Sequence, residues 1–94
     1  VALLIVGAEK AWAACDKAMR SALPFLENNP DGKALLPAAY FYIGLANFRL
    51  ARGGARVEPA RNAEAKKYFT ACAAAASPYQ AQAQKFLAAI AAGK

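Results

Sequence analysis

The sequence predicts an all-α fold, a single domain of about four antiparallel helices over residues 1–94. Alanine supplies 27 residues, so the apolar content of 59% overstates the buried bulk. Val, Ile and Thr are too few for a sheet protein. Apolar residues recur at spacings of three and four, which is the period of an amphipathic helix. The length allows one domain with a modest core.

A long first helix is expected over residues 1–27. Pro24 lies in its last turns, where the missing N–H should kink the helix or end it early. Residues 28–32 favour turn geometry and predict a loop. The apolar start, 1–6, is too short to span a bilayer, which takes about 20 residues, and no basic region precedes it as in a signal peptide. The apolar face of this helix consists of Ile5, Ala8, Trp12, Cys15, Met19, Ala22 and Leu26.

A hairpin of two helices is expected over residues 34–76. Its first helix covers 34–52, or 37–52 if it starts at the proline, because two consecutive glycines follow and stop a helix. Its second helix covers 59–76 or 62–76. The connector between them is longer than a tight helix hairpin needs.

A last helix is expected over residues 77–92. Ser77 is placed as its N-cap and Pro78 as its first helical residue. Gln80 would then complete a capping box with Ser77. The apolar stripe of this helix consists of Tyr79, Ala83, Phe86 and Ile90.

Small and aromatic residues alternate across the hairpin in a recognisable order. The residues concerned are Tyr40, Ile43, Gly44, Ala65, Phe69 and Cys72, followed by a closing Pro78. This pattern resembles a tetratricopeptide repeat, with Asn47 standing where the family has an aromatic residue. The resemblance implies that Gly44 and Ala65 let the two helices approach closely while aromatic rings fill the space beside them. It also identifies residues 8–26 with the second helix of a preceding repeat and 77–92 with a capping helix.

The helix over 34–52 carries a second apolar stripe on a different side. It either covers the first helix of the same chain or makes an intermolecular contact, since a helix apolar nearly all round is buried on several sides or forms an interface. In the resembled family this side lines a concave groove that binds partner segments. The predicted interface residues are Val1, Leu3, Leu4, Ile5, Val6, Ala38, Phe41, Leu45, Phe48 and Arg49.

These unmatched surfaces predict a protein-interaction or scaffold module that associates with itself. Contact between the apolar start of one copy and the stripe of another would be head-to-tail, giving an oligomer or a filament. The alternative is a piece of a longer repeat protein whose groove binds a partner peptide.

The net charge of +6 suggests a third function, a basic anion-binding module. Half of the Lys and Arg residues fall within 49–67, where only two acidic residues occur. No helix combines these cations with base-reading side chains, so specific nucleic-acid binding is not expected. Asp16 is expected to be an ordinary solvated charge with Lys17 and Arg20 nearby.

No catalytic residue, cofactor or metal site is expected, and the chain is predicted not to be an enzyme. The sequence has no His, the commonest general base and metal ligand. Cys15 and Cys72 are either two small buried hydrophobes or one disulfide that joins the first and third helices. The missing initiator Met, together with two cysteines outside any metal motif, favours an exported chain, periplasmic or extracellular, over a cytoplasmic one.

Overall fold

The computed structural model describes residues 2–54 and 56–93, with side chains from Lys10 onward. Within these residues the chain is all-helical, which confirms the predicted fold class. The helices are α1 (Ala2–Asn28), α2 (Pro30–Lys33), α3 (Leu36–Ala51), α4 (Pro59–Ala73) and α5 (Gln80–Ala91). None of the described helices is both long enough and apolar enough to cross a membrane.

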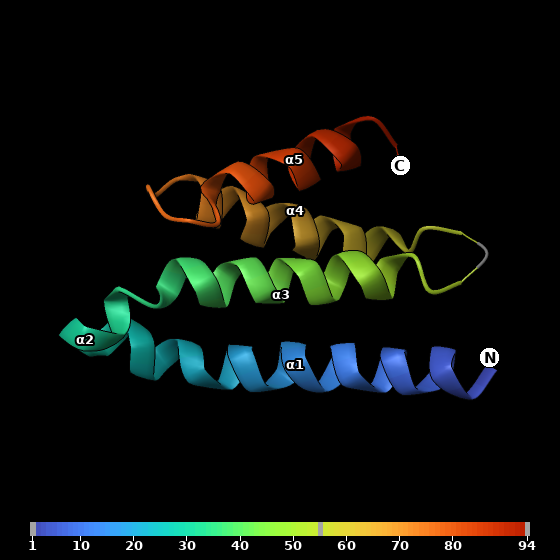
Figure 1. Ribbon diagram of the computed structural model, residues 1–94, viewed down its shortest axis with the longest axis horizontal. Helices are drawn as coiled ribbons and strands as arrows, with labels where there is room; N and C mark the ends of the chain where they lie inside the picture. The colour runs from blue at the N-terminus through green and yellow to red at the C-terminus, as the bar shows by residue number, and fades with distance from the viewer. Residues whose placement is uncertain (1, 55, 94) are drawn as a thin grey trace.

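The four long helices lie side by side in a row, and each runs antiparallel to the next (Figure 1). The central helix α3 packs against α1 on one side and α4 on the other, while α5 packs against α4. Helices α1 and α5 therefore form the two edges of a molecule that measures 42 × 27 × 21 Å.

The end of α1 differs from the expectation in two ways. Pro24 does not end the helix, which continues to Asn28, and the Asn28 side chain donates a hydrogen bond to the Pro24 carbonyl at 2.7 Å. The expected loop contains one helical turn, α2, because Asn29 is a good N-cap and Pro30 suits the first helical position. The Asn29 side chain accepts a hydrogen bond from the Asp31 N–H at 3.0 Å.

The predicted capping box before α5 is wrong. The Ser77 hydroxyl oxygen accepts a hydrogen bond from the Tyr79 N–H at 3.2 Å, and the helix begins only at Gln80. Gln80 donates its side-chain N–H to the Ala73 carbonyl at 3.0 Å instead of reaching Ser77. It thus satisfies one of the carbonyls that the end of α4 leaves without an intrahelical partner.

The core lies where α3, α4 and α5 meet. Ile43, Phe69 and Cys72 are fully buried. Gly44 of α3 lies close against Phe69 of α4, since a Cβ atom on the glycine would lie 2.9 Å from Cδ1 of Phe69. The Phe69 ring stacks in turn on Phe86 of α5, with the centroids 4.8 Å apart. Gly44 therefore leaves the space on α3 in which the Phe69 ring lies.

Other residues of the predicted repeat pattern lie around this core. Ala65 is fully buried, and Tyr40 is half-buried, with its ring centroid 6.1 Å from that of Tyr68.

The structure corrects the prediction that Phe41 is an interface residue. Its side chain is only 5% exposed, with ring centroids 5.1 Å from Tyr79 and 6.0 Å from Phe86. The cover comes from α5 of the same chain, and not from the first helix, because α1 packs on another side of α3.

The remaining predicted interface residues have mixed exposure. Ala38, Leu45 and Phe48 are half-buried, with the latter two packed against the core cluster, and Arg49 is exposed. The N-terminal part of the prediction falls outside what the structure describes, namely residue Val1 and the side chains of Leu3, Leu4, Ile5 and Val6.

Candidate functional site

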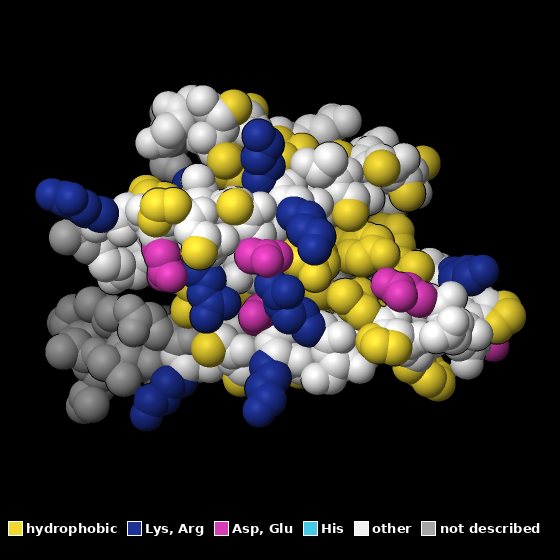
Figure 2. Space-filling model, turned by 180° about the vertical axis from the view of Figure 1, so that it is seen from behind, with side chains coloured by type: hydrophobic (Ala, Val, Ile, Leu, Met, Phe, Trp, Pro, Cys, Tyr) yellow, Lys and Arg dark blue, Asp and Glu magenta, His cyan; other side chains and the backbone are white. Residues whose placement is uncertain are grey.

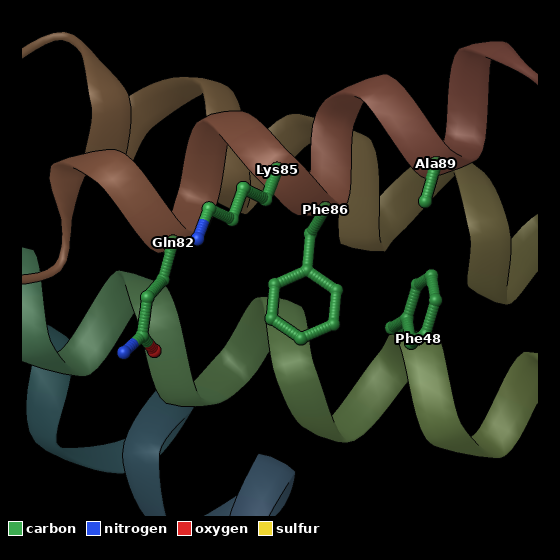
Figure 3. A pocket seen from close by; sticks show the side chains of 5 residues that line it. All are labelled: Phe48, Gln82, Lys85, Phe86 and Ala89. Carbon is green, nitrogen blue, oxygen red and sulfur yellow. The ribbon is translucent and has the colours of Figure 1, made fainter.

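An open pocket lies between α3 and α5 (Figure 3). Its volume is about 440 Å³, within the range of roughly 300–1,000 Å³ found for ligand pockets. It is lined by Phe48, Gln82, Lys85, Phe86 and Ala89. Figure 3 shows the two phenylalanine rings, one from each helix, reaching into the space between the helices.

The two rings form a rigid apolar wall. Phe48 and Phe86 meet edge to face with their centroids 4.9 Å apart, a favoured aromatic geometry. Behind them, Phe86 stacks on the fully buried Phe69. Because Phe86 stacks on the core, the aromatic wall of the pocket is preformed, while the lining side chains of Gln82 and Lys85 are exposed.

Two positive charges lie on or near this pocket, one on Lys85, which lines it, and one on Arg52, which does not line it but lies against the Phe48 ring. The Arg52 guanidinium lies 3.7 Å from the Phe48 ring centroid, and it donates to the Phe48 carbonyl at 3.2 Å and to the Asn62 side chain at 3.1 Å. Burial lowers the pKa of Arg52. Lys85 supplies the second charge, and no ion pair joins it to any other described residue.

The two helices that form the walls, α3 and α5, contain no Asp or Glu residue. The pocket therefore combines an aromatic wall with one positive charge, that of Lys85. Such a site suits an apolar group that has a negative charge beside it.

Sequence reasoning found only part of this pocket. Phe48 belongs to the predicted interface stripe, whereas Gln82, Lys85 and Ala89 were missed because the last helix was interpreted as a cap alone. The sequence did contain a sign of this pocket. The apolar stripe of the last helix includes Phe86, and a helix that only caps a repeat array needs no aromatic residue of this size.

The opposite face of the molecule holds a polar network that joins three helices. Asp16 of α1 is only 8% exposed, and its Oδ1 accepts hydrogen bonds from Arg20 Nε at 2.7 Å and from Asn47 Nδ2 at 2.8 Å. Arg61 of α4 donates to Asn47 Oδ1 at 3.0 Å and lies 3.5 Å from Asp16 Oδ2. Figure 2 shows basic and acidic side chains gathered in the middle of the face seen from behind.

This network corrects the prediction that Asp16 is an ordinary solvated charge. It also accounts for Asn47, which is 0% exposed: Nδ2 donates to the Ile43 carbonyl at 2.9 Å as well as to Asp16, and Arg61 satisfies Oδ1. The sequence contained one sign of this network, because Asp16 and Asn47 are polar residues that each lie on an apolar helix face. The two become partners only when α1 and α3 pack together.

Arg20 extends the network toward α4. It donates to Glu64 Oε2 and to the Tyr68 hydroxyl, each at 3.3 Å. Burial of the guanidinium disfavours its charge, but hydrogen bonding and Coulomb attraction to Asp16, with smaller effects of Tyr68 and Glu64, raise the Arg20 pKa. Of the six clustered cations in 49–67, Arg52, Arg61 and Lys67 have partners on the protein, the last being the Tyr68 ring at 5.4 Å.

The two cysteines are free thiols in the structure, so the disulfide alternative is not formed. The reason is that the two cysteines lie at different positions along the neighbouring helices α1 and α4. Asp16 contacts Arg61 near the start of α4, and Cys72 lies eleven residues further on, roughly 16 Å along the helix axis. A disulfide requires Cα atoms within about 7 Å.

The Cys72 thiol makes folding sensitive to alkaline pH. Burial raises its pKa above the ordinary value of 9.0, although a hydrogen bond with Ser77 opposes this. The unfolded chain loses this proton at a lower pH than the folded chain does, so stability is intact below about pH 8 and declines as the pH rises toward and past the ordinary thiol pKa of 9.0.

We therefore expect the urea midpoint of the reduced protein to fall between about pH 8 and pH 9.5, below the range in which tyrosines ionise. Cys72→Ala should lower stability at pH 7 but flatten this decline, whereas the matched Cys15→Ala should retain it. An equally steep decline in Cys72→Ala would show that the Cys72 thiol does not cause the loss of stability at alkaline pH.

No group of three or more potential metal-ligating His, Cys, Asp or Glu side chains occurs among the described residues. The comparisons of this chain with protein-family models, with curated proteins and with solved structures find no significant match.

Proposed function

We propose that this chain is a non-enzymatic protein-interaction module whose α3–α5 pocket holds an apolar side chain from a segment of a partner protein. The observation that carries the proposal is the preformed pocket between Phe48 and Phe86. Tight protein–protein contacts concentrate their energy in a few apolar anchors that fill such pockets.

A tetratricopeptide-like build is part of this proposal. Three features support it: the close approach of α3 and α4 at Gly44, the buried Ala65 opposite, and a further helix, α5, after Pro78. In that architecture α3 and α5 are successive first helices and face the concave groove, while α1 and α4 form the other face. The pocket lies between the two helices that this build assigns to the groove.

The openness of the pocket favours a side chain on a longer segment over a small enclosed ligand. Phe48 and Phe86 are each half-buried, so part of each ring faces the pocket. Burying a large apolar side chain there would contribute about 1.5–3 kcal/mol. Polar groups of the segment could remain hydrated or contact Gln82 at the edge of the pocket.

A pocket-filling variant tests the proposal. Ala89 lines the pocket and the neighbouring Ala88 is exposed, so Ala89→Trp fills the site and Ala88→Trp is a control of equal bulk. We would select peptides from a displayed random library on the native chain and measure their binding by titration calorimetry.

Selected peptides should share a large apolar residue and bind Ala88→Trp as they bind the native chain. Ala89→Trp should weaken them at least about tenfold, which corresponds to about 1.4 kcal/mol. Equal binding to both tryptophan variants, or a selection that yields no binder, would count against this function. Circular dichroism of both variants shows whether the helices are retained.

A further inference from the structure

Three of the long helices share an apolar core to which the described part of α1 does not contribute. The buried cluster of this core takes its side chains from α3, α4 and α5 alone. Its members are Phe41, Ala65, Phe69, Cys72 and Ala83. The partly buried apolar side chains packed against the cluster also come from α3 onward, as far as the structure describes the chain. Helices α3, α4 and α5 therefore have a core of their own.

The packing of α1 is polar at its most buried point. Between Lys10 and Asn28 the only buried residue is Asp16, which is 8% exposed. Half-buried apolar side chains lie on either side of it, namely Trp12, Cys15, Met19 and Leu26. The stabilisation from an apolar side chain scales with the area removed from water. Each of these side chains therefore contributes less to the docking of α1 than a fully buried one would.

The Asp16 network, formed by Asp16, Arg20, Asn47, Arg61 and Glu64, joins α1 to the other helices. Asp16 accepts a hydrogen bond from Asn47 of α3 at 2.8 Å and pairs with Arg61 of α4 at 3.5 Å. One turn further along α1, Arg20 donates to Glu64 of α4 at 3.3 Å. Such buried pairs add little stability beyond well-packed apolar residues, but breaking one by removing a partner is costly. The docked position of α1 therefore depends on the carboxylate of Asp16.

Helix α2 packs with α1, and an exposed connection follows it. A Cβ atom on Gly32 of α2 would lie 2.8 Å from the Cα atom of Leu26, so the two backbones are in close contact. Ala34 and Leu35, which lead from α2 into α3, are both exposed. Hinges are formed by a few loop or helix-end residues that absorb a change of φ and ψ. These two residues can change conformation without disturbing the core (Figure 1).

We infer that α1 and α2 form an arm that undocks as a unit from a body made of α3, α4 and α5, turning at Ala34 and Leu35. Segments with few buried apolar contacts are those that open at the lowest free energy. Undocking uncovers the Asn47 amide and the Tyr68 hydroxyl, which Arg20 contacts in the docked state. The α3–α5 pocket is retained, because its lining residues all belong to the body. The proposed function of that pocket can therefore hold or fail independently of this inference.

Amide hydrogen exchange of the whole chain, read by mass spectrometry, tests whether the arm opens alone. Amides of residues 12–28 should exchange at least about tenfold faster than the most protected amides of α3 and α4. Phe69→Leu weakens only the body, since the ring of Phe69 contacts rings of α3 and α5. It should accelerate exchange in α3 and α4 at least about tenfold.

Exchange in residues 12–28 of Phe69→Leu should stay within about twofold of the native rate, because the arm opens while the body is still folded. Cys72→Ala is a milder variant of the same core, in case Phe69→Leu fails to fold, and should give the same pattern. An acceleration of 12–28 equal to that of α3 and α4 would overturn the inference, because the chain would then open only as one unit.

Asp16→Asn tests the role of the network, since it removes the charge and keeps the size of the side chain. Exchange in residues 12–28 should accelerate at least about tenfold, because two guanidinium groups lose their anion. The matched control is Glu27→Gln, an exposed carboxylate of the same helix outside the network, which should stay within about twofold of the native rate. Unchanged exchange in Asp16→Asn, or equal acceleration in Glu27→Gln, would overturn the inference.

The arm and the body also carry different optical probes. The one tryptophan of the chain, Trp12, lies in α1, and all four tyrosines lie after the hinge. In Asp16→Asn, rising urea should change the fluorescence of Trp12 before it changes the tyrosine absorbance. Transitions that do not coincide show that more than two states are populated. Coincident transitions in this variant would contradict an arm that leaves a folded body.

Discussion

Replacing Phe41 by aspartate is expected to unfold the chain. The ring is 5% exposed and lies against Phe69, Tyr79 and Phe86. Removing a buried phenylalanine side chain costs about 3–5 kcal/mol. A carboxylate in its place would be desolvated among aromatic rings without a partner, which adds a further cost. The total is comparable to the stability of a small domain, about 5–15 kcal/mol.

The matched control is the same substitution at an exposed phenylalanine. Phe25→Asp should change the unfolding free energy by no more than about 0.5 kcal/mol, as is usual for surface sites. Far-UV circular dichroism and urea unfolding measure both variants. A helical Phe41→Asp chain with normal stability and impaired assembly would mean that the ring belongs to an intermolecular interface after all.

Removing the Asp16 carboxylate should have the next largest effect, a loss of about 2–4 kcal/mol. In Asp16→Ala, the buried Asn47 amide loses a hydrogen-bond acceptor, and Arg20 and Arg61 lose the anion that lies between them. Breaking a buried ion pair by removing one partner costs about 3–5 kcal/mol. The two guanidinium side chains are about a third exposed, 35% and 37%, so solvent recovers part of that cost.

Glu64→Ala is the control, because it removes a carboxylate of the same network that is 40% exposed. We expect it to cost less than about 1 kcal/mol. Urea unfolding at neutral pH compares the two variants. Equal losses would show that Asp16 acts as a surface charge, and the predicted difference would then be wrong.

The positions of the helices followed from local sequence patterns. The predictions were wrong where a contact with another part of the chain outweighed the local pattern. The proline of α1 was tolerated because the helix is held along its length by α3. Gln80 was expected to cap its own helix, yet it bonds to the end of α4, seven residues earlier. A local pattern contains no information about which unsatisfied carbonyl will lie within reach.

The candidate pocket shows the same limit. Phe48 was placed on an apolar stripe, and Phe86 on another, from spacing alone. Neither pattern states that the two stripes face one another across an open groove, since that depends on how α5 lies over α3. The same packing placed Phe41 inside the core and left the neighbouring Phe48 half-buried.

The sequence by itself determined the all-α class, the four long helices and the charge of the chain, because helical period, turn chemistry and composition are local or additive properties. Only the tertiary structure decided which apolar stripe is covered, that the thiols stay apart, and that Asp16 meets Asn47. Those two residues are separated by 31 positions. Their pairing depends on the register between α1 and α3, which is set by the packing of both complete helices.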